Sequence, residues 1–182
     1  MNLLLKIARI YIPPFYKKKK LIELFELTAR AFQSDISNIK GLSVDDCLHE
    51  YALFTKTQAE KAIKQNHSVQ EIKQRLYRNA YQLGKELRKN FRITTMDEVM
   101  LMSRLLYHII GIEFQGDSTG KVMITRCFFS QYYTSQVCQV ISSLDEGVAA
   151  GLSGGGKLTF VQRMTEGYDC CKAHFKLTGN QP

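Results

Sequence analysis

Three cysteines in the last third of the chain have the residue type and the spacing that chemistry would use. Cys127 lies at the end of a predicted strand, and Cys138 falls on the apolar face of the helix predicted after it. Cys171 belongs to the apolar face of the last predicted strand, whereas Cys170 points the other way because strand residues alternate. These three thiols could converge where helix and sheet meet. They could act there as a nucleophile, as metal ligands or as small buried hydrophobic groups.

Several polar side chains lie where they could assist a thiol. A catalytic cysteine needs a base or a positive neighbour to form its thiolate. His108 ends the last helix before the sheet, and Asp145 and Glu146 lie on the helix that carries Cys138. Asp145 falls on the apolar face of that helix, where a carboxylate needs a partner. We therefore expect a catalytic set of Cys127, Asp145, Glu146 and His108, with Arg126 and Cys171 binding the substrate and Arg126 holding its carboxylate.

Zinc is a candidate cofactor for the same thiols. The ligand set would be Cys127, Cys138 and Cys171. The chain has no C-x-x-C pair, and adjacent cysteines such as Cys170 and Cys171 chelate poorly because neighbours in a strand point apart. The sequence therefore leaves the metal open.

A glycine-rich stretch matches a phosphate-binding pattern but lacks its context. Gly151-Leu-Ser-Gly-Gly-Gly-Lys157 fits G-x-x-x-x-G-K, a loop that normally leaves a strand and opens a helix. Here a helix is predicted before the loop and a strand after it, and Leu158 stands where Ser or Thr should reach a magnesium ion. We therefore predict a helix C-cap and a turn here, with no nucleotide bound.

The elements that must position these groups form an α+β pattern. Residues 21–110 show helical periodicity over four or five helices, with capping-box spacing at Ser43, Ser68 and Thr95. From Gly111 the period changes to alternation. We predict a hairpin over residues 112–116 and 121–127, a helix over 134–150, and strands over 157–165 and 170–177. The expected order is an N-terminal helical layer, then β-β-α-β-β with an antiparallel sheet, in one domain over residues 21–182 with its sheet-containing part at 111–177.

The positive charge of the chain is concentrated at its start. The net charge is +8, and residues 1–20 contribute six basic and no acidic side chains. The remainder is nearly neutral, so a basic field for nucleic acid is not expected. Residues 3–12 predict a short apolar helix that ends at Pro13-Pro14 before four lysines. Residues 1–20 could contact an anionic membrane surface, or dock on the domain with the lysines as a linker.

The cysteine count and the opening segment bear on location. Five cysteines are an odd number, and the opening apolar stretch is too short for a membrane span and lacks the flanks of a secretory signal. We therefore expect reduced thiols in a cytoplasmic protein that is peripheral to a membrane if residues 1–20 bind one.

Three runs of residues and one separate cysteine together resemble a known family. They are Ile124-Thr-Arg-Cys-Phe-Phe-Ser130, then Cys138, then Leu144-Asp-Glu-Gly-Val-Ala-Ala-Gly-Leu152, then Thr165-Glu-Gly-Tyr-Asp-Cys-Cys171. Over residues 21–177 the chain resembles the L-2-amino-thiazoline-4-carboxylic acid hydrolase-like family. That resemblance implies hydrolytic opening of a cysteine-derived thiazoline ring.

The order of elements is also similar to the 4-vinyl reductase domain and to the TRAPP transport-complex subunits. Those folds enclose small apolar ligands or lipid chains, and some of them bind zinc. Cys138 and Cys171 match two ligand positions of the zinc-binding versions. The Glu-x-x-Cys expected around residues 160–164 is absent from this sequence, so the resemblance implies an incomplete zinc site unless Cys127 substitutes.

Two functional hypotheses follow. The first is a hydrolase acting on a small cysteine-derived heterocycle or amide in a cysteine-lined pocket between helix and sheet. The second is a binding module that encloses an apolar small molecule or acyl chain at a membrane surface. The identity of the ligand and the oligomeric state are not determined by the sequence.

Overall fold

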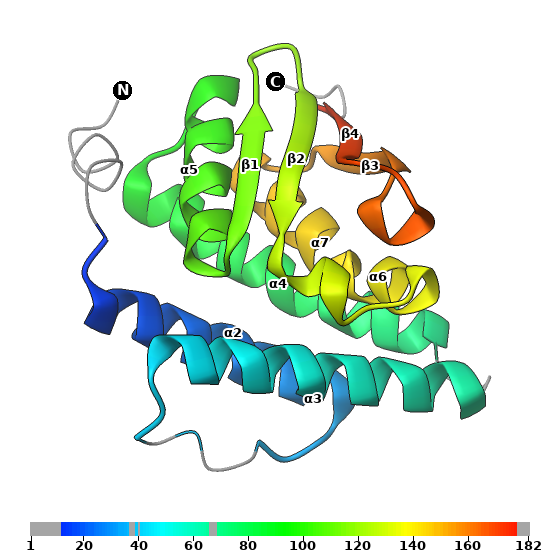
Figure 1. Ribbon diagram of the computed structural model, residues 1–182. Helices are drawn as coiled ribbons and strands as arrows, with labels where there is room; N and C mark the ends of the chain where they lie inside the picture. Colours follow the sequence, from blue (N-terminus) through cyan, green and yellow to red (C-terminus); the bar gives the residue numbers. More distant parts are fainter. Residues whose placement is uncertain (1–11, 37–38, 40, 66–68, 178–182) are drawn as a thin grey trace.

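The fold of the chain is α+β, as the sequence predicts. The structure is a computed structural model that describes residues 12–36, 39, 41–65 and 69–177. Four long helices come first, and a four-stranded antiparallel sheet follows (Figure 1). The helices are α2 (Pro14–Phe32), α3 (Val44–Gln65), α4 (Val69–Phe91) and α5 (Met96–Ile109). The sheet-containing part holds β1 (Ile112–Gly116), β2 (Lys121–Cys127), η1 (Phe128–Gln131), α6 (Ser135–Ile141), α7 (Ser143–Ser153), β3 (Lys157–Gln162), η2 (Met164–Glu166) and β4 (Cys171–Lys176).

Helix α2 begins earlier than the sequence predicts. Proline is favoured at the start of a helix, and here Pro14 is the first residue of α2. The lysines at 17–20 therefore lie in the first turns of a helix that runs on to Phe32, and not in a linker. The predicted boundary after residue 20 falls inside this helix, and the helix predicted over residues 3–12 lies outside the described residues apart from Ile12. No helix in the described part of the chain is long and apolar enough to cross a membrane.

Two of the predicted helix starts are capped as expected. At α5 the Thr95 side chain accepts a hydrogen bond from the Glu98 amide, and the Glu98 side chain accepts one from the Thr95 amide. At α3 the Asp46 amide donates to Ser43 Oγ at 3.1 Å. The third predicted cap, Ser68, lies outside the described residues.

The backbones of helices α4 and α7 are in direct contact, and this close packing holds α7 against the helical layer. Gly84 of α4 faces Gly151 of α7, and a Cβ at Gly84 would lie 2.9 Å from the Leu152 amide nitrogen. A Cβ at Gly151 would overlap the carbonyl oxygen of Tyr81, and one at Gly147 would overlap that of Tyr77. The close approach predicted for Gly84 is confirmed. In Figure 1, α2 and α3 lie on the side of α4 that is far from the sheet.

The helix predicted over residues 134–150 is two helices. Helix α6 ends and α7 begins at the buried Ser142, whose hydroxyl lies within hydrogen-bond distance of the Gln139 carbonyl. Serine competes with the helix for backbone hydrogen bonds in this way. Helix α7 continues to Ser153 and is capped by Gly154 in the left-handed conformation, at φ 82°. The predicted C-cap is confirmed, three residues later than expected.

The sheet has the strand order β1-β2-β4-β3. Its inner face carries alternating buried residues, most regularly in β4, where Cys171, Ala173 and Phe175 are buried. Strand β3 ends at Gln162, three residues before the predicted end, because the chain turns into η2. The inner face packs over α5 and α7, and a cavity lined in part by Cys171 lies between the sheet and the helices.

Candidate functional site

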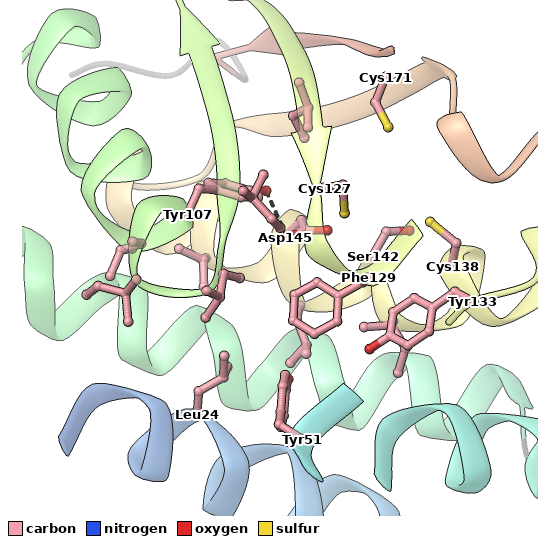
Figure 2. A pocket seen from close by; sticks show the side chains of 18 of the residues that line it. Leu24, Tyr51, Tyr107, Cys127, Phe129, Tyr133, Cys138, Ser142, Asp145 and Cys171 are labelled. Atoms are coloured by element: carbon pink, nitrogen blue, oxygen red, sulfur yellow. Dashed lines mark hydrogen bonds between the residues drawn. The ribbon is translucent and has the colours of Figure 1, made fainter. Parts of the chain in front are cut away.

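A cavity of about 150 Å³ lies between the helices and the inner face of the sheet (Figure 2). Its wall is predominantly aliphatic and aromatic, and includes Leu24, Leu83, Leu106, Ile124, Phe129 and Val148. The polar groups in the wall come from Tyr51, Tyr107, Tyr133, Asp145, Ser142, Arg163, three cysteines and, at the α2 side, Lys20 and Glu23. Such a combination of apolar wall and few polar groups is typical of small-molecule sites.

A bulge in β2 brings Cys127 into this cavity. Ile124 is buried on the inner face, and strict alternation would next place Arg126 inside. The register between β1 and β2 shifts at this point, and Thr125 is the extra residue in β2. Cys127 therefore lines the cavity, while the Arg126 side chain is 78% exposed. Bulges commonly re-aim side chains in this way.

A second bulge does the same at the end of β3. Phe160 pairs with Ala173 and Gln162 pairs with Lys172, so Val161 is the extra residue. Alternation from Phe160 would send Arg163 outward. After the extra residue, Arg163 instead lines the cavity together with Phe160.

The structure brings the three predicted thiols to the same cavity. Figure 2 shows Cys127, Cys138 and Cys171 around it, each from a different element. Burial raises the pKa of all three. For Cys127 burial raises the pKa to about 12, although hydrogen bonds from the backbone of Phe129 and Ser130 act in the opposite direction. At pH 7 a thiol of that pKa is ionised in about one molecule in 100,000, so Cys127 is a poor nucleophile here.

The thiols do not form a metal-binding cluster. Within the described ranges, no group of three or more His, Cys, Asp or Glu side chains is arranged to hold a metal ion. Cys171 Sγ instead accepts a hydrogen bond from the Met164 amide at 3.3 Å. The thiols come from separate walls of an apolar space, so the predicted set of Cys127, Cys138 and Cys171 is not assembled as a zinc site in this structure.

Asp145 has the partner that its apolar position requires. The Tyr107 hydroxyl donates a 2.7 Å hydrogen bond to Asp145 Oδ1, drawn as a dashed line in Figure 2. The pKa of Asp145 is raised to about 7, mainly by burial and to a smaller extent by the neighbouring Glu146, although the Tyr107 hydrogen bond and the Arg163 charge act in the opposite direction. A carboxyl group with a pKa near neutrality can donate or accept a proton at physiological pH.

Three predicted site residues lie elsewhere. His108 is exposed on α5, because the inward position of that turn is taken by its neighbour Tyr107. Glu146 lines a separate surface depression beside α4. Arg126 pairs with Glu113 on the outer face of the sheet, 3.7 Å from it. None of these three lines the cavity, so the predicted base, second carboxylate and substrate-binding arginine are not brought to the site.

Arg163, Tyr107 and Ser142 are the site residues that sequence reasoning missed. Arg163 packs its guanidinium 4.6 Å from the centre of the Phe160 ring, and its side chain is 14% exposed. Tyr107 is buried on the inward side of α5, and its pKa is raised well above the usual value by burial and by Asp145. Tyr107 could have been found from the helical period, since it shares the face of other buried α5 residues. The position of Arg163 depends on the bulge, which no sequence signal marked.

The comparisons add no family to this description. A scan of the sequence against protein-family models found no match, and a search of curated proteins found none. The likeness to the aminothiazoline-carboxylate hydrolase-like family therefore stays a prediction.

Proposed function

We propose that the protein binds a small, predominantly apolar molecule in the cavity between its helices and its sheet. The observation that supports this most is the cavity itself, about 150 Å³ with a largely apolar wall. A dry apolar cavity of about that volume admits a benzene-sized molecule. Each methylene group that a ligand buries there contributes about 0.8 kcal/mol to binding.

The state of the thiols favours binding over thiol catalysis. Burial raises the pKa of Cys127, Cys138 and Cys171, so at neutral pH all three line the cavity as uncharged groups. A protonated, buried cysteine behaves as a small polarisable hydrophobic group and packs well against an apolar ligand. The same three residues therefore support a ligand cavity without requiring a nucleophile.

A chain-length series of n-alkanols tests this proposal. We expect the affinity to rise about fourfold for each added methylene until the cavity is full, and then to level off. Ile141→Trp, which fills part of the cavity, should weaken binding of the longer alcohols, whereas Leu53→Trp on the exposed side of α3 should not. Titration calorimetry measures both. Equal binding by the two variants, or no binding of any alcohol, would contradict the proposal.

A hydrolase is the second candidate, because Asp145 could act as a general acid or base in the cavity. Its pKa is raised to about 7 by burial, the range in which proton transfer at neutral pH is efficient. On this hypothesis the carboxylate would activate water to open a cysteine-derived thiazoline ring. Wild-type protein incubated with 2-amino-thiazoline-4-carboxylate would then release a carbamoyl-cysteine, and Asp145→Asn would not. Failure of the wild type to turn it over would rule out this substrate.

We also propose that the start of α2 contacts an anionic membrane surface from the cytoplasm, where the five unpaired cysteines would stay reduced. Phe15 is 75% exposed, and the first turn of α2 has no acidic residue. The lysines that follow lie near the positive end of the helix dipole, which is unfavourable for them. Membrane contact would offset that cost.

Deleting residues 1–20 would truncate α2, so substitutions are the better test. Lys17→Glu with Lys19→Glu should abolish cosedimentation with phosphatidylserine vesicles, and Lys61→Glu on α3 should not; unchanged cosedimentation would reject the proposal.

A further inference from the structure

Two basic side chains line the cavity, and they differ in how well their charge is matched. Lys20 Nζ lies 2.6 Å from Glu23 Oε2, so its charge already has a hydrogen-bonded partner. The nearest carboxylate to Arg163 is that of Glu166, and the distance between Nη1 and Oε1 is 3.8 Å. That separation is too long for a hydrogen bond. Of these two cations, Arg163 is therefore the one that has no carboxylate within hydrogen-bond distance.

The hydrogen bonding of Arg163 is also incomplete. Its Nε is buried and has no hydrogen-bond partner among the described residues. Its Nη2 donates to Ser142 Oγ at 3.3 Å, at the long end of the usual range. Leaving a buried donor unpaired is costly, and native proteins that keep one commonly do so for an ion or a function. The guanidinium to which this Nε belongs lines the cavity, and 14% of the Arg163 side chain is exposed.

The guanidinium is held in a fixed plane. It packs over the Phe160 ring at 4.6 Å, and the bulge at Val161 sets the direction in which the side chain leaves the strand. Nε–H and one Nη–H of an arginine lie along one edge and fit the two oxygens of one carboxylate. Ser142, which lines the same cavity, borders the group.

We infer that Arg163 binds the carboxylate of a ligand whose apolar body fills the cavity, so that the ligand class is a small apolar monocarboxylate. This inference rests on the proposed ligand-binding function and deepens it. A short fatty acid or an aromatic acid has the required chemistry. A second charged group on the ligand would lie against the hydrophobic wall, where its desolvation is costly. The other charged groups of the cavity would not offset that cost, because Lys20 is already paired with Glu23 and Asp145 is itself an acid.

Paired titrations of n-octanoate and n-octanol test the inference, since the two differ only in the head group. At pH 6 Asp145, with a pKa of about 7, carries little charge. We expect wild-type protein to bind octanoate about tenfold or more tighter than octanol, as for a hydrogen-bonded ion pair. Arg163→Met should remove that preference, and octanol binding that persists in this variant would show that the cavity is intact. Glu166→Gln should strengthen octanoate binding severalfold.

Arg126→Met is the matched control, because it removes an arginine from the outer face of the same sheet. It should leave both affinities unchanged. Equal binding of the acid and the alcohol by the wild type would overturn this inference while leaving the proposed function in place. So would a preference that survives Arg163→Met but is lost in Lys20→Met. If neither compound binds, both proposals fail together.

Discussion

Asp145→Asn should stabilise the protein at alkaline pH and lose that advantage as the pH falls. Burial raises the pKa of Asp145 from the usual 3.8 to about 7 in the folded state. Between these values the folded protein keeps a proton that the unfolded chain has lost, so stability decreases as pH rises. Asparagine cannot ionise, and its oxygen can still accept the hydrogen bond from Tyr107.

The size of the effect follows from the shift. About three pKa units at about 1.4 kcal/mol each give a penalty of about 4 kcal/mol once both states are ionised. By the same relation about 1.5 kcal/mol is already present at pH 5, so the variant should gain about 3 kcal/mol on the wild type between pH 5 and pH 8.5. This gain of about 3 kcal/mol is an upper bound, because part of the Asp145 surface faces the cavity and water there would solvate the carboxylate.

Urea unfolding of both proteins at half-unit pH intervals measures this difference directly. The groups that act on Asp145 are Tyr107, Glu146 and Arg163. Asp97→Asn, which removes a carboxylate from the exposed first turn of α5, controls for net charge. If the stability difference between wild type and Asp145→Asn stays constant within about 0.5 kcal/mol from pH 5 to 8.5, Asp145 is not a desolvated acid and the account of the cavity is wrong.

Three further predictions concern the frame and the thiols. Gly151→Ala should lower the free energy of unfolding by about 2–3 kcal/mol, because the added Cβ would overlap the α4 backbone. The control Gly167→Ala should lower it by only about 1 kcal/mol, because no atom lies within 4 Å of that Cβ and the loss comes from φ +93° alone. Similar losses for the two variants in urea unfolding would contradict the packing of α7 on α4. Thr95→Ala should cost about 1 kcal/mol by removing the α5 cap, and an unchanged urea midpoint would disprove it. Cys127 should resist iodoacetamide at pH 7.5 in the folded protein, because its raised pKa leaves roughly a thousandth of the thiolate that an ordinary thiol has. Labelling of the folded protein as fast as in urea would refute the burial of this thiol.

Much of the fold was predictable from local patterns. Helical periodicity placed the apolar faces of the long helices, and Thr95 with Glu98 marked the start of α5 because the cap is a short-range interaction. Alternation identified all four strands. The break between α6 and α7 was missed, since the periodicity is nearly the same on both sides of Ser142 and the break depends on contacts of that residue.

The cavity was predictable in part. Cys138, Cys171 and Asp145 were placed correctly from the faces of regular elements, and all three line the cavity. Arg126 and His108 were wrong as cavity residues, because proximity in sequence says little about which side of a strand or helix a residue takes.

The sequence by itself determined which faces are apolar, that helices precede an antiparallel sheet, and that Cys138, Cys171 and Asp145 would lie on the faces directed toward the core. Only the tertiary structure decided which arginine reaches the cavity. One extra residue in β2 turns Cys127 inward and Arg126 outward, and one in β3 turns Arg163 inward. Because side chains in a strand alternate with a period of two, one inserted residue moves every later side chain to the opposite face of the sheet. Pairing with the neighbouring strand decides whether the extra residue is accommodated as a bulge.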